Sequence, residues 1–596
     1  MKPTIEILDR ISENSRNNKE EIFTRLYRYM LRPDLYYLAY KNLYANKGAS
    51  TKGVDDDTAD GFSEEKISKI IRSLADETYT PKPVRREYIQ KKQNSTKKRP
   101  LGIPTFTDKL VQEVLRMILE SVYEPTFSSN SHGFRPNRSC HTALNSIKKG
   151  FNGVTWFIEG DIKGCFDNID HHTLVDILGS KIKDARLIKL IWKFLKAGYM
   201  EDWIYHKTYS GCPQGGIISP LLSNIYLNEL DKFAEKTATE FFKPKDKVCS
   251  TEYKRIAGRR DYAKKLLKTA QGQRKAELLI TVKALTAQLH TVPFSPKSDK
   301  VMKYIRYADD FIIGIKGNMS DCERIKQQFS EFISQTLKME LSDVKTLITH
   351  SNQYARFLGY DVRVRREQKL KPHGNHLART LNNTVELNIP FADKIMPFLF
   401  GKLAIRQTSD GAIEPAPRQY LYRCTDLEII SSYNSELRGI CNYYGLASNF
   451  TRLDYFAYLM EYSCLKTLAG KHGSTSKKMI EKYHIKNGSW GIPYDTKKGQ
   501  RFREFARYQD CKNADSFNDV IINFGARHAG TRTVFEDRLS AEVCELCGKT
   551  NTPLEMHHVN KVKNLKGKQD WEIIMIAKKR KTLAVCKGCH HKIHHP

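Results

Sequence analysis

Apolar and polar residues change their periodicity several times along the chain, and each change predicts a different structural block. Residues 1 to about 75 are predicted to be helical and basic, with Pro33 ending an apolar run made of Phe23, Leu26, Tyr27, Met30 and Leu31. Residues 76 to about 230 are expected to alternate short strands with turns. A strand-like block then runs from Val301 to about Val364. The pattern therefore predicts helices first and a strand-rich region after them.

Two apolar stripes between about residues 390 and 470 predict a pair of packed helices. The first stripe consists of Ile430, Tyr433, Leu437, Ile440 and Tyr444. The second stripe consists of Leu453, Phe456, Met460 and Leu468. Helix packing is the simplest role for both stripes.

Two basic segments separate these blocks. A weakly apolar stretch from about 232 to 300 is rich in Lys and Arg, which predicts a long helical or mobile insertion. Residues 485–540 are also basic and contain turn signals at Gly488, Gly491 and Pro493. They predict a linker or a small binding domain.

With 596 residues, the chain is too long for one hydrophobic core, and three to five domains are expected. No apolar run reaches the roughly 18 residues that a membrane-spanning helix needs. Residues 1–10 carry charge but no apolar signal core. We therefore expect no membrane partner, and the absence of a targeting segment favours a bacterial cytoplasm.

The charge balance gives the first indication of a partner. Lys and Arg total 99 against 67 Asp and Glu, a formal net charge of +32. Such an excess favours a polyanion, and 30 Tyr and 27 Phe are available to stack on bases. A merely basic protein and a membrane-surface protein are the weaker alternatives. Nucleic acid is the predicted partner.

Four of the 13 cysteines form two C-x-x-C pairs close to the end of the sequence. The other nine are scattered, as expected for small core residues in a reduced compartment. Four thiolates in two such pairs suit one tetrahedral Zn²⁺. The predicted ligands are Cys544, Cys547, Cys586 and Cys589.

The strongest chemical motif is Tyr-Ala-Asp-Asp at residues 307–310, between two β-type runs. Two adjacent acids on the turn of a hairpin can both reach a metal, and Asp161 ends a further apolar strand. Nucleotidyl transfer uses two Mg²⁺ held roughly 4 Å apart by converging carboxylates. An isolated Asp-Asp pair is more often a solvated turn, so the argument depends on the motifs occurring together.

These motifs resemble the group II intron-encoded reverse transcriptases, and the resemblance covers the whole chain. It implies that Asp161, Asp309 and Asp310 bind the catalytic Mg²⁺. It also implies that Phe166 fills the space of a ribose 2′-hydroxyl and so selects deoxynucleotides, although a plain core role for Phe166 stays open.

The same resemblance assigns further contacts to the incoming nucleotide. Arg99, within Lys-Arg-Pro-Leu-Gly-Ile-Pro at 98–104, is expected to hold the triphosphate. Gln214 lies in Gly-Cys-Pro-Gln-Gly-Gly at 211–216 and is expected in the minor groove beside the new base pair. Lys345 matches another palm motif, and residues 357–360 resemble the primer grip.

The resemblance implies a multidomain α+β architecture with five parts. Residues 1–75 would be an RNA-binding extension, and 76–385 would form the fingers and palm of a right-hand polymerase. Residues 386–484 would be the helical thumb, called domain X, which stabilises the folded intron RNA. Residues 485–540 would be a small DNA-binding domain, and 541–596 a C-terminal nuclease module.

The C-terminal module resembles an HNH endonuclease, a ββα unit with one Mg²⁺ or Mn²⁺. The motif makes His558 the general base, and His557, His590 and His594 ligands of the catalytic metal. Lys581 stands where the family usually has the Asn that orients the base. Asn560, Asn564 or no residue would then fill that role, and a purely structural zinc finger is the alternative.

Together these features predict a protein that binds its intron RNA, nicks a DNA target and copies the RNA with deoxynucleotides. A splicing-only maturase is the non-enzymatic alternative, and a bacterial defence or diversity-generating reverse transcriptase is the third. The intact acids Asp161, Asp309 and Asp310 argue against the second, and the long thumb with a terminal nuclease argues against the third. The sequence leaves a homodimer open.

Overall fold

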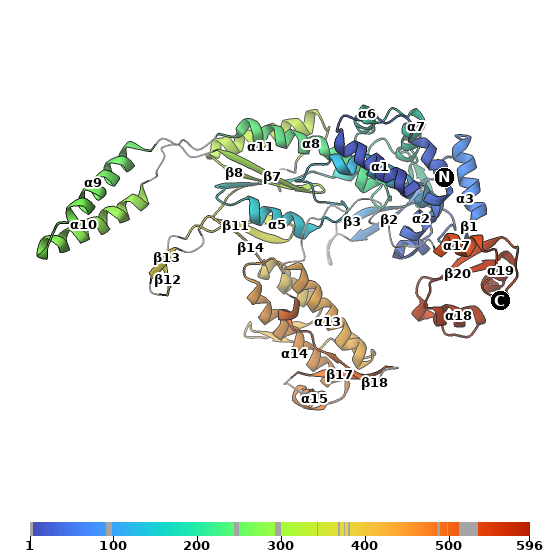
Figure 1. Cartoon of the computed structure of the whole chain (residues 1–596). Coiled ribbons are helices and arrows are strands. Elements are labelled where there is room, and N and C mark those ends of the chain that lie inside the picture. Colours follow the sequence, from blue (N-terminus) through green and yellow to red (C-terminus); the bar gives the residue numbers. More distant parts are fainter. Residues whose placement is uncertain are drawn as a thin grey trace.

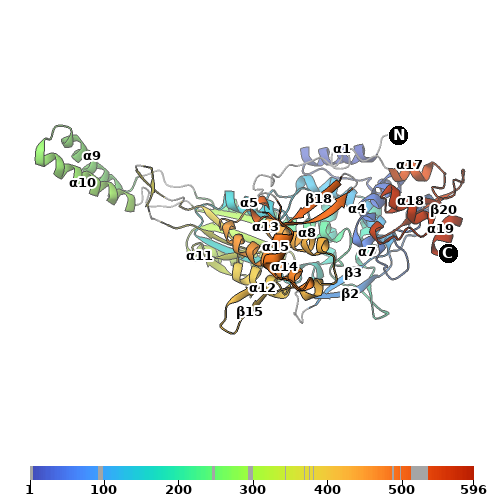
Figure 2. The same ribbon diagram turned by 90° about the horizontal axis from the view of Figure 1, so that it is seen from below.

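The computed structural model describes residues 4–90, 98–243, 249–292, 300–342, 344–367, 370–374, 376–379, 382–485, 489–496, 499–511 and 534–595. It is an elongated mixed α/β molecule (Figure 1). A helical hairpin lies at one end and the C-terminal module at the other, as the two views of Figures 1 and 2 agree. No helix among the described residues is long and apolar enough to cross a membrane.

The central sheet has four strands in the order β7-β8-β4-β9. Strands β7 (Val301–Tyr307) and β8 (Asp310–Lys316) form an antiparallel hairpin, as the sequence predicts. Strand β4 (Trp156–Asp161) lies between β8 and β9 (Ile348–His350). Helices α8 (Ser219–Phe241) and α11 (Met319–Gln335) cover one face, and α5 (Cys140–Gly150) lies against the other (Figure 1).

A second sheet follows the order β3-β2-β5-β6 and carries the predicted fingers motif. Its strands are β2 (Val84–Gln90), β3 (Lys98–Ile103), β5 (Tyr199–Glu201) and β6 (Ile204–His206). The expected alternation of strands and turns over residues 76–230 is wrong for most of that range. It is largely helical, with α4 (Phe106–Tyr123), α5, α6 (His171–Lys181), α7 (Ala185–Leu195) and α8.

Helix α4 shows why that expectation failed. All but two of its 18 residues, Thr107 and Arg116, are buried. Its polar residues nevertheless recur at helical spacing, at Lys109, Gln112, Glu113, Arg116 and Glu120, and this helical pattern was overlooked.

The strand-like block from Val301 to Val364 is also interrupted, because α11 follows the central hairpin. The helix begins with a capping box between Asn318 and Asp321. Its buried residues recur at helical spacing, and they are Asp321, Cys322, Ile325, Phe329 and Ile333. Strands β10 (Ala355–Phe357), β11 (Tyr360–Val364) and β14 (Val385–Asn388) form the next sheet.

The N-terminal region is helical, but its boundaries differ from the prediction. It contains α1 (Thr4–Asn17), a 3₁₀ turn at Tyr27–Leu31, α2 (Pro33–Tyr44) and α3 (Glu64–Ala75). Pro33 begins α2 instead of ending a helix, because a proline fits the first helical turn, where its missing N–H has no partner to lose.

The basic stretch 232–300 begins in the last part of α8 and continues as a hairpin of α9 (Thr251–Leu267) and α10 (Gly272–Thr291). Ile256, Leu285 and Leu289 form its own small core. The hairpin projects from the molecule (Figure 1). Residues 244–248 and 293–299 of this predicted insertion lie outside the described residues.

Both predicted apolar stripes form helices, α13 (Asp426–Tyr443) and α14 (Leu453–Lys471), which pack against each other. A hairpin of β17 (Gly491–Thr496) and β18 (Gly499–Glu504) packs on α13. Much of the predicted DNA-binding segment 485–540 lies outside the described residues, namely 486–488, 497–498 and 512–533. Smaller elements around these helices are α12 (Met396–Gly401), β15 (Ile405–Gln407), β16 (Ile413–Pro415) and α15 (Ser476–Lys482).

The C-terminal module contains α17 (Val534–Ser540), β19 (Leu554–His558), α18 (Asp570–Lys578), β20 (Thr582–Cys586) and α19 (Lys587–His594). Strand β19 pairs with β20 and also with β1 (Phe62–Ser63) from the N-terminal region. The two ends of the chain therefore share one three-stranded sheet (Figure 1).

Candidate metal sites of the palm and the C-terminal module

The central sheet brings the three predicted carboxylates together. Asp161 ends β4 and lies directly opposite Asp310 at the start of β8. Asp309 occupies the turn between β7 and β8, where Ala308 has a φ of 56°. That left-handed residue turns the chain sharply enough to place the two adjacent acids at the same end of the sheet.

The electrostatics of these carboxylates favour a cation. Burial, the charge of Asp309 and a hydrogen bond with Asp161 raise the pKa of Asp310 to about 7. Burial and the charge of Asp161 also raise the pKa of Asp309. Acids held this close repel one another when ionised, and divalent cations with oxygen ligands relieve that repulsion. The donor set therefore fits the cations that the sequence predicts.

Two predicted nucleotide contacts lie beside the carboxylates. Lys345 Nζ is 2.8 Å from Oδ2 of Asp161, so this lysine pairs with one of the three carboxylates. The charge of Arg99, on β3, offsets part of the rise in the pKa of Asp309. Their roles in nucleotide binding stay predictions.

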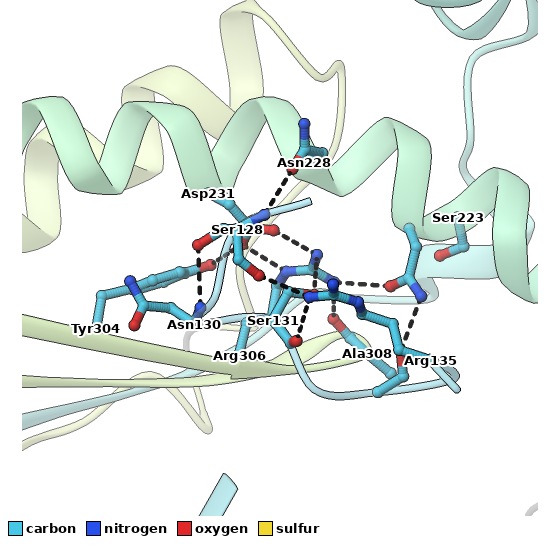
Figure 3. A network of polar contacts seen from close by, with 12 residues as sticks. Ser128, Asn130, Ser131, Arg135, Ser223, Asn228, Asp231, Tyr304, Arg306 and Ala308 are labelled. Atoms are coloured by element: carbon cyan, nitrogen blue, oxygen red, sulfur yellow. Dashed lines mark hydrogen bonds and ion pairs between the residues drawn. The ribbon is translucent and has the colours of Figure 1, made fainter. Parts of the chain in front are cut away.

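A buried ion pair that the sequence analysis missed supports the Asp309 turn. Arg306 on β7 and Asp231 on α8 are both fully buried, and Arg306 Nη2 lies 2.6 Å from Asp231 Oδ2 (Figure 3). Arg306 also donates to the backbone carbonyl of Ala308 at 2.9 Å and to the Ser131 hydroxyl at 2.8 Å. Tyr304 donates its hydroxyl to Asp231.

A close backbone contact adds to this support. A side chain at Gly133 would place its Cβ only 2.2 Å from the amide nitrogen of Ala308, so glycine is required there. Asn224 on α8 donates to the Gly133 carbonyl at 2.8 Å. The segment around Gly133 is therefore fixed between α8 and the Asp309 turn.

Phe166 and Gln214, from distant parts of the chain, lie close together in the structure. Phe166 is half-buried, and its ring packs edge-on against Phe134 with centroids 6.0 Å apart. The Phe166 carbonyl accepts a hydrogen bond from the Cys212 amide at 2.7 Å. Gln214 Nε2 donates to the Asp167 carboxylate at 3.3 Å. A cleft of about 410 Å³ is lined by Asp167, Gly211, Gln214 and other residues.

In the C-terminal module, the four predicted cysteines form one cluster. The Sγ atoms of Cys544, Cys547, Cys586 and Cys589 all lie within 4.8 Å of one another. Burial opposes ionisation of Cys544, but hydrogen bonds from the Cys547 and Cys586 amides lower the pKa of its thiol to about 7. Four sulfurs at these separations fit a tetrahedral metal ion.

The three predicted histidine ligands also meet, and Asp60 joins them. The ligand atoms of Asp60, His557, His590 and His594 lie within 4.8 Å of one another. Burial raises the pKa of Asp60, but its close contacts with His557 and His590 outweigh burial and hold that pKa well below its usual range. Asp60 lies just before β1, and no motif in the sequence connects it with residues about 500 positions away.

His558, the predicted general base, contacts the N-terminal region. Its Nε2 lies 3.0 Å from the Tyr44 carbonyl, and its amide donates to Asp60 Oδ1 at 2.6 Å. Lys581, at the place of the usual orienting Asn, donates to the Ala45 carbonyl instead. The Tyr44 carbonyl, at the end of α2, therefore makes the contact with His558 that the side chain of the usual Asn would make. Among the described hydrogen bonds of His558, none involves Asn560 or Asn564.

Comparison with known proteins agrees with the order of these sites. Residues 89–253 match the family described as reverse transcriptase (RNA-dependent DNA polymerase). Residues 382–523 match the type II intron maturase family, and residues 544–590 match the AI2M/AI1M-like HNH endonuclease family.

Several relatives match nearly the whole chain. The group II intron-encoded protein LtrA of Lactococcus lactis subsp. cremoris is 59% identical over 100% of both chains. An uncharacterized 91 kDa protein in a cob intron of Schizosaccharomyces pombe is 34% identical, over 98% of this chain and 72% of that one. The putative COX1/OXI3 intron 2 protein of Saccharomyces cerevisiae is 32% identical, over 98% of this chain and 68% of that one.

The fold and the sites define a reverse transcriptase that also carries maturase and HNH endonuclease domains. The chain belongs to the family of group II intron-encoded proteins. It is therefore a multifunctional intron protein that combines RNA-directed DNA polymerase and endonuclease activities with a maturase, and its partners include intron RNA.

The buried ion pair gives a stability prediction. Arg306→Met should lower the free energy of opening of β7 and β8 by about 3–5 kcal/mol, because Asp231 is left buried and unpaired. The double variant Arg306→Met/Asp231→Leu should recover most of the loss. Native-state hydrogen exchange of the β7 and β8 amides measures both effects.

A matched control is Glu240→Gln, which removes an exposed ion pair with Lys236 on the same helix. It should change the opening free energy by less than about 1 kcal/mol. If Arg306→Met were no more destabilising than Glu240→Gln, the ion pair would not support the Asp309 turn.

Proposed function

We propose that Asp161, Asp309 and Asp310 hold two Mg²⁺ and form the polymerase centre. The observation that supports this most directly is the register of β4 and β8, which sets Asp161 opposite Asp310 beside the Asp309 turn. When bound, the two ions activate the primer 3′-hydroxyl and stabilise the leaving pyrophosphate. The protein's own contribution is to hold the three carboxylates at one end of a rigid sheet.

Arg99 and Lys345 are proposed to contact the triphosphate of the incoming nucleotide. Lys345 pairs with Asp161 and would contact a phosphate oxygen when the nucleotide binds. Arg99 lies on an exposed part of β3, where its fork of N–H donors can pair with phosphate. Both side chains add positive charge beside three acids.

Phe166 is proposed to exclude the ribose 2′-hydroxyl, and Gln214 to contact the minor groove. The backbone of Phe166 is fixed by the Cys212 amide, and its ring is backed by Phe134. A fixed backbone and a ring packed against Phe134 restrict how far the side chain can move aside for a hydroxyl group. Gln214 already donates to Asp167, so its amide is oriented beside the cleft before nucleotide arrives.

Residues 1–75 and 386–484 are proposed to hold the folded intron RNA, and 485–540 to hold target DNA. A protein that binds only the folded RNA stabilises it by mass action, so the RNA remains the splicing catalyst. The net charge of +32 supports binding to both nucleic acids. The fingers and palm would then span 76–385, with the insertion at about 232–300, and the nuclease 541–596.

For the nuclease, we assign His558 as general base, His557, His590 and His594 as ligands of one Mg²⁺ or Mn²⁺, and the four cysteines as ligands of a structural Zn²⁺. Glu555 supports this, because its carboxylate lies 2.7 Å from His590 Nδ1 and leaves Nε2 facing the cluster. The metal, when bound, would stabilise charge on the scissile phosphate. Nicking of a DNA strand would supply the 3′ end that the polymerase extends.

Two simpler functions fit the structure less well. A splicing-only maturase would have no use for three converging carboxylates beside polyanionic RNA. A purely structural zinc finger would not need the histidine cluster in addition to the four cysteines. The first alternative predicts that the intact protein has no polymerase activity. The second predicts that it has no endonuclease activity.

The two proposed centres should be separable by single substitutions. Asp309→Asn should abolish primer extension on an RNA template, a loss of at least about 100-fold, and leave DNA nicking intact. His558→Ala should abolish nicking by a similar factor and leave extension intact. Both activities are measured on the same reconstituted ribonucleoprotein. Loss of both activities in either variant would contradict two separate centres.

The sugar selectivity of Phe166 gives a further prediction. Phe166→Val should raise ribonucleotide incorporation relative to deoxynucleotide incorporation by at least about tenfold, because space opens beside the sugar. Phe166→Tyr keeps the ring and serves as the matched control, with selectivity close to the parent. Single-nucleotide primer extension gives the ratio of kcat/KM values. Equal selectivity in the parent and the Val variant would assign Phe166 to the core alone.

A further inference from the structure

Asp60 lies in the middle of the histidine cluster, although it comes from the opposite end of the chain. Its Oδ2 is 3.1 Å from His590 Nε2 and 2.8 Å from His594 Nε2. Its Oδ1 is 3.2 Å from His557 Nδ1. One carboxylate therefore contacts all three imidazoles that the nuclease proposal makes metal ligands.

The burial of His557 supports an ion within the cluster. Its side chain is only 4% exposed. Both of its ring nitrogens are buried without a hydrogen-bond partner among the described residues, since the Asp60 contact lies at ion-pair distance but outside hydrogen-bond geometry. Buried polar atoms are rarely left unsatisfied, and a metal ion between these groups would satisfy them.

The position of Asp60 is fixed by a well-packed interface. The next residue, Gly61, donates its amide to the Met556 carbonyl at 3.0 Å, and Phe62 pairs with Met556 across the β1–β19 contact. Phe62 is fully buried and stacks on Tyr40 with ring centroids 4.0 Å apart. Asp60 thus belongs to a shared core and is not a mobile side chain that happens to reach the cluster.

The α17 helix closes the same interface. The ring of Phe535 packs edge-on against Tyr40 and Tyr44, at 5.4 and 4.9 Å between centroids. Tyr44 in turn supplies the carbonyl that contacts His558. The N-terminal segment therefore supports both the proposed base and the proposed ligands of the nuclease.

We propose that Asp60 is a fourth protein ligand of the nuclease metal, so that this centre is built jointly by the two ends of the chain. The proposal rests on the proposed nuclease function of the histidine cluster. A carboxylate adds the hard, charged oxygen that Mg²⁺ and Mn²⁺ prefer and that three neutral imidazoles lack. Asp60 and the three histidines would hold the ion, which would supply positive charge to a DNA phosphate beside His558.

The joint site would link metal binding to the docking of the nuclease module. The metal would tie the nuclease module to the N-terminal segment that is proposed to hold intron RNA. Metal binding at this site would then stabilise the β1–β19 contact as well as the histidines. A nuclease that depends on this contact is complete only when the module is docked on the body of the protein.

The alternative role of Asp60 is a plain hydrogen-bond acceptor that orients histidines without touching a metal. The alternative predicts that Asp60→Asn, which keeps the shape of the side chain and one of its two acceptor oxygens, weakens metal binding by no more than about 100-fold, as loss of an orienting partner does. The proposal predicts a larger loss. The distinction is therefore measurable by metal binding itself, without reference to cleavage.

The experiment titrates Mn²⁺ into the full chain and follows free Mn²⁺ by electron paramagnetic resonance. All variants carry Asp309→Asn and Asp310→Asn, which remove the polymerase ions from the titration. In this background, Asp60→Asn and Asp60→Ala should weaken Mn²⁺ binding at the remaining site by more than about 100-fold, beyond the loss that an orienting partner causes. Glu65→Gln is the matched control, because it breaks exposed ion pairs with Lys587 at the same interface and with Lys69, and touches no proposed metal ligand. It should leave the affinity within about twofold of the parent.

A second readout reports on docking. Mn²⁺ should slow hydrogen exchange of the Gly61 amide in the parent background and not in Asp60→Asn. Unchanged affinity in Asp60→Asn, with His557→Ala losing the site, would overturn the ligand role of Asp60 and leave the nuclease metal site standing. Unchanged affinity in His557→Ala would overturn the proposed nuclease site itself.

Discussion

The guanidinium of Arg306 and the carboxylate of Asp231 are both removed from water, so neither can lose its partner without leaving a buried charge. This pair joins β7 to α8 directly beneath the Asp309 turn. The same guanidinium donates to Ala308 and Ser131. The position of the carboxylates, the segment around Gly133 and the packing of α8 therefore all depend on one charge pair. The turn that carries Asp309 is held in place because the Arg306–Asp231 pair beside it is hydrogen-bonded on both partners.

The second centre is built on a different principle. Three histidines come from one compact ββα unit, whereas Asp60 and the Tyr44 carbonyl come from the N-terminal region. A shared sheet and the stacked rings of Tyr40 and Phe62 hold the two parts together. The nuclease thus gains a ligand and an orienting group that its own sequence lacks. Lys581 can stand at the position of the usual Asn because the Tyr44 carbonyl already contacts His558.

Sequence reasoning succeeded where a motif carried its own geometry. Two acids between β-type runs predicted a hairpin with both carboxylates at the turn, and two apolar stripes predicted α13 and α14. It overlooked α4, whose polar residues recur at helical spacing, and α11, although a capping box marks its start. Proline interrupts helices and therefore predicts a helix end at Pro33, but it fits equally well at a helix start.

Within the sites, sequence reasoning could not find contacts between residues that lie far apart in the chain. Arg306 and Asp231 are 75 positions apart and occur in no motif, so no local signal connects them. Asp60 and His590 are 530 positions apart, and only the pairing of β1 with β19 brings them together. The four cysteines could be grouped because C-x-x-C spacing carries a metal signal by itself. The roles and the domain boundaries assigned from motifs remain predictions.

Anomalous X-ray diffraction tests the central claim that one chain holds two separate metal-dependent centres. Crystals of the full chain with a template–primer duplex and Mn²⁺ would be measured at the manganese and zinc absorption edges. The account predicts manganese peaks beside Asp161, Asp309 and Asp310, and among Asp60, His557, His590 and His594, with a zinc peak at the four cysteines. No manganese at one of the two centres, or manganese at the histidines without Asp60 bound to it, would contradict it.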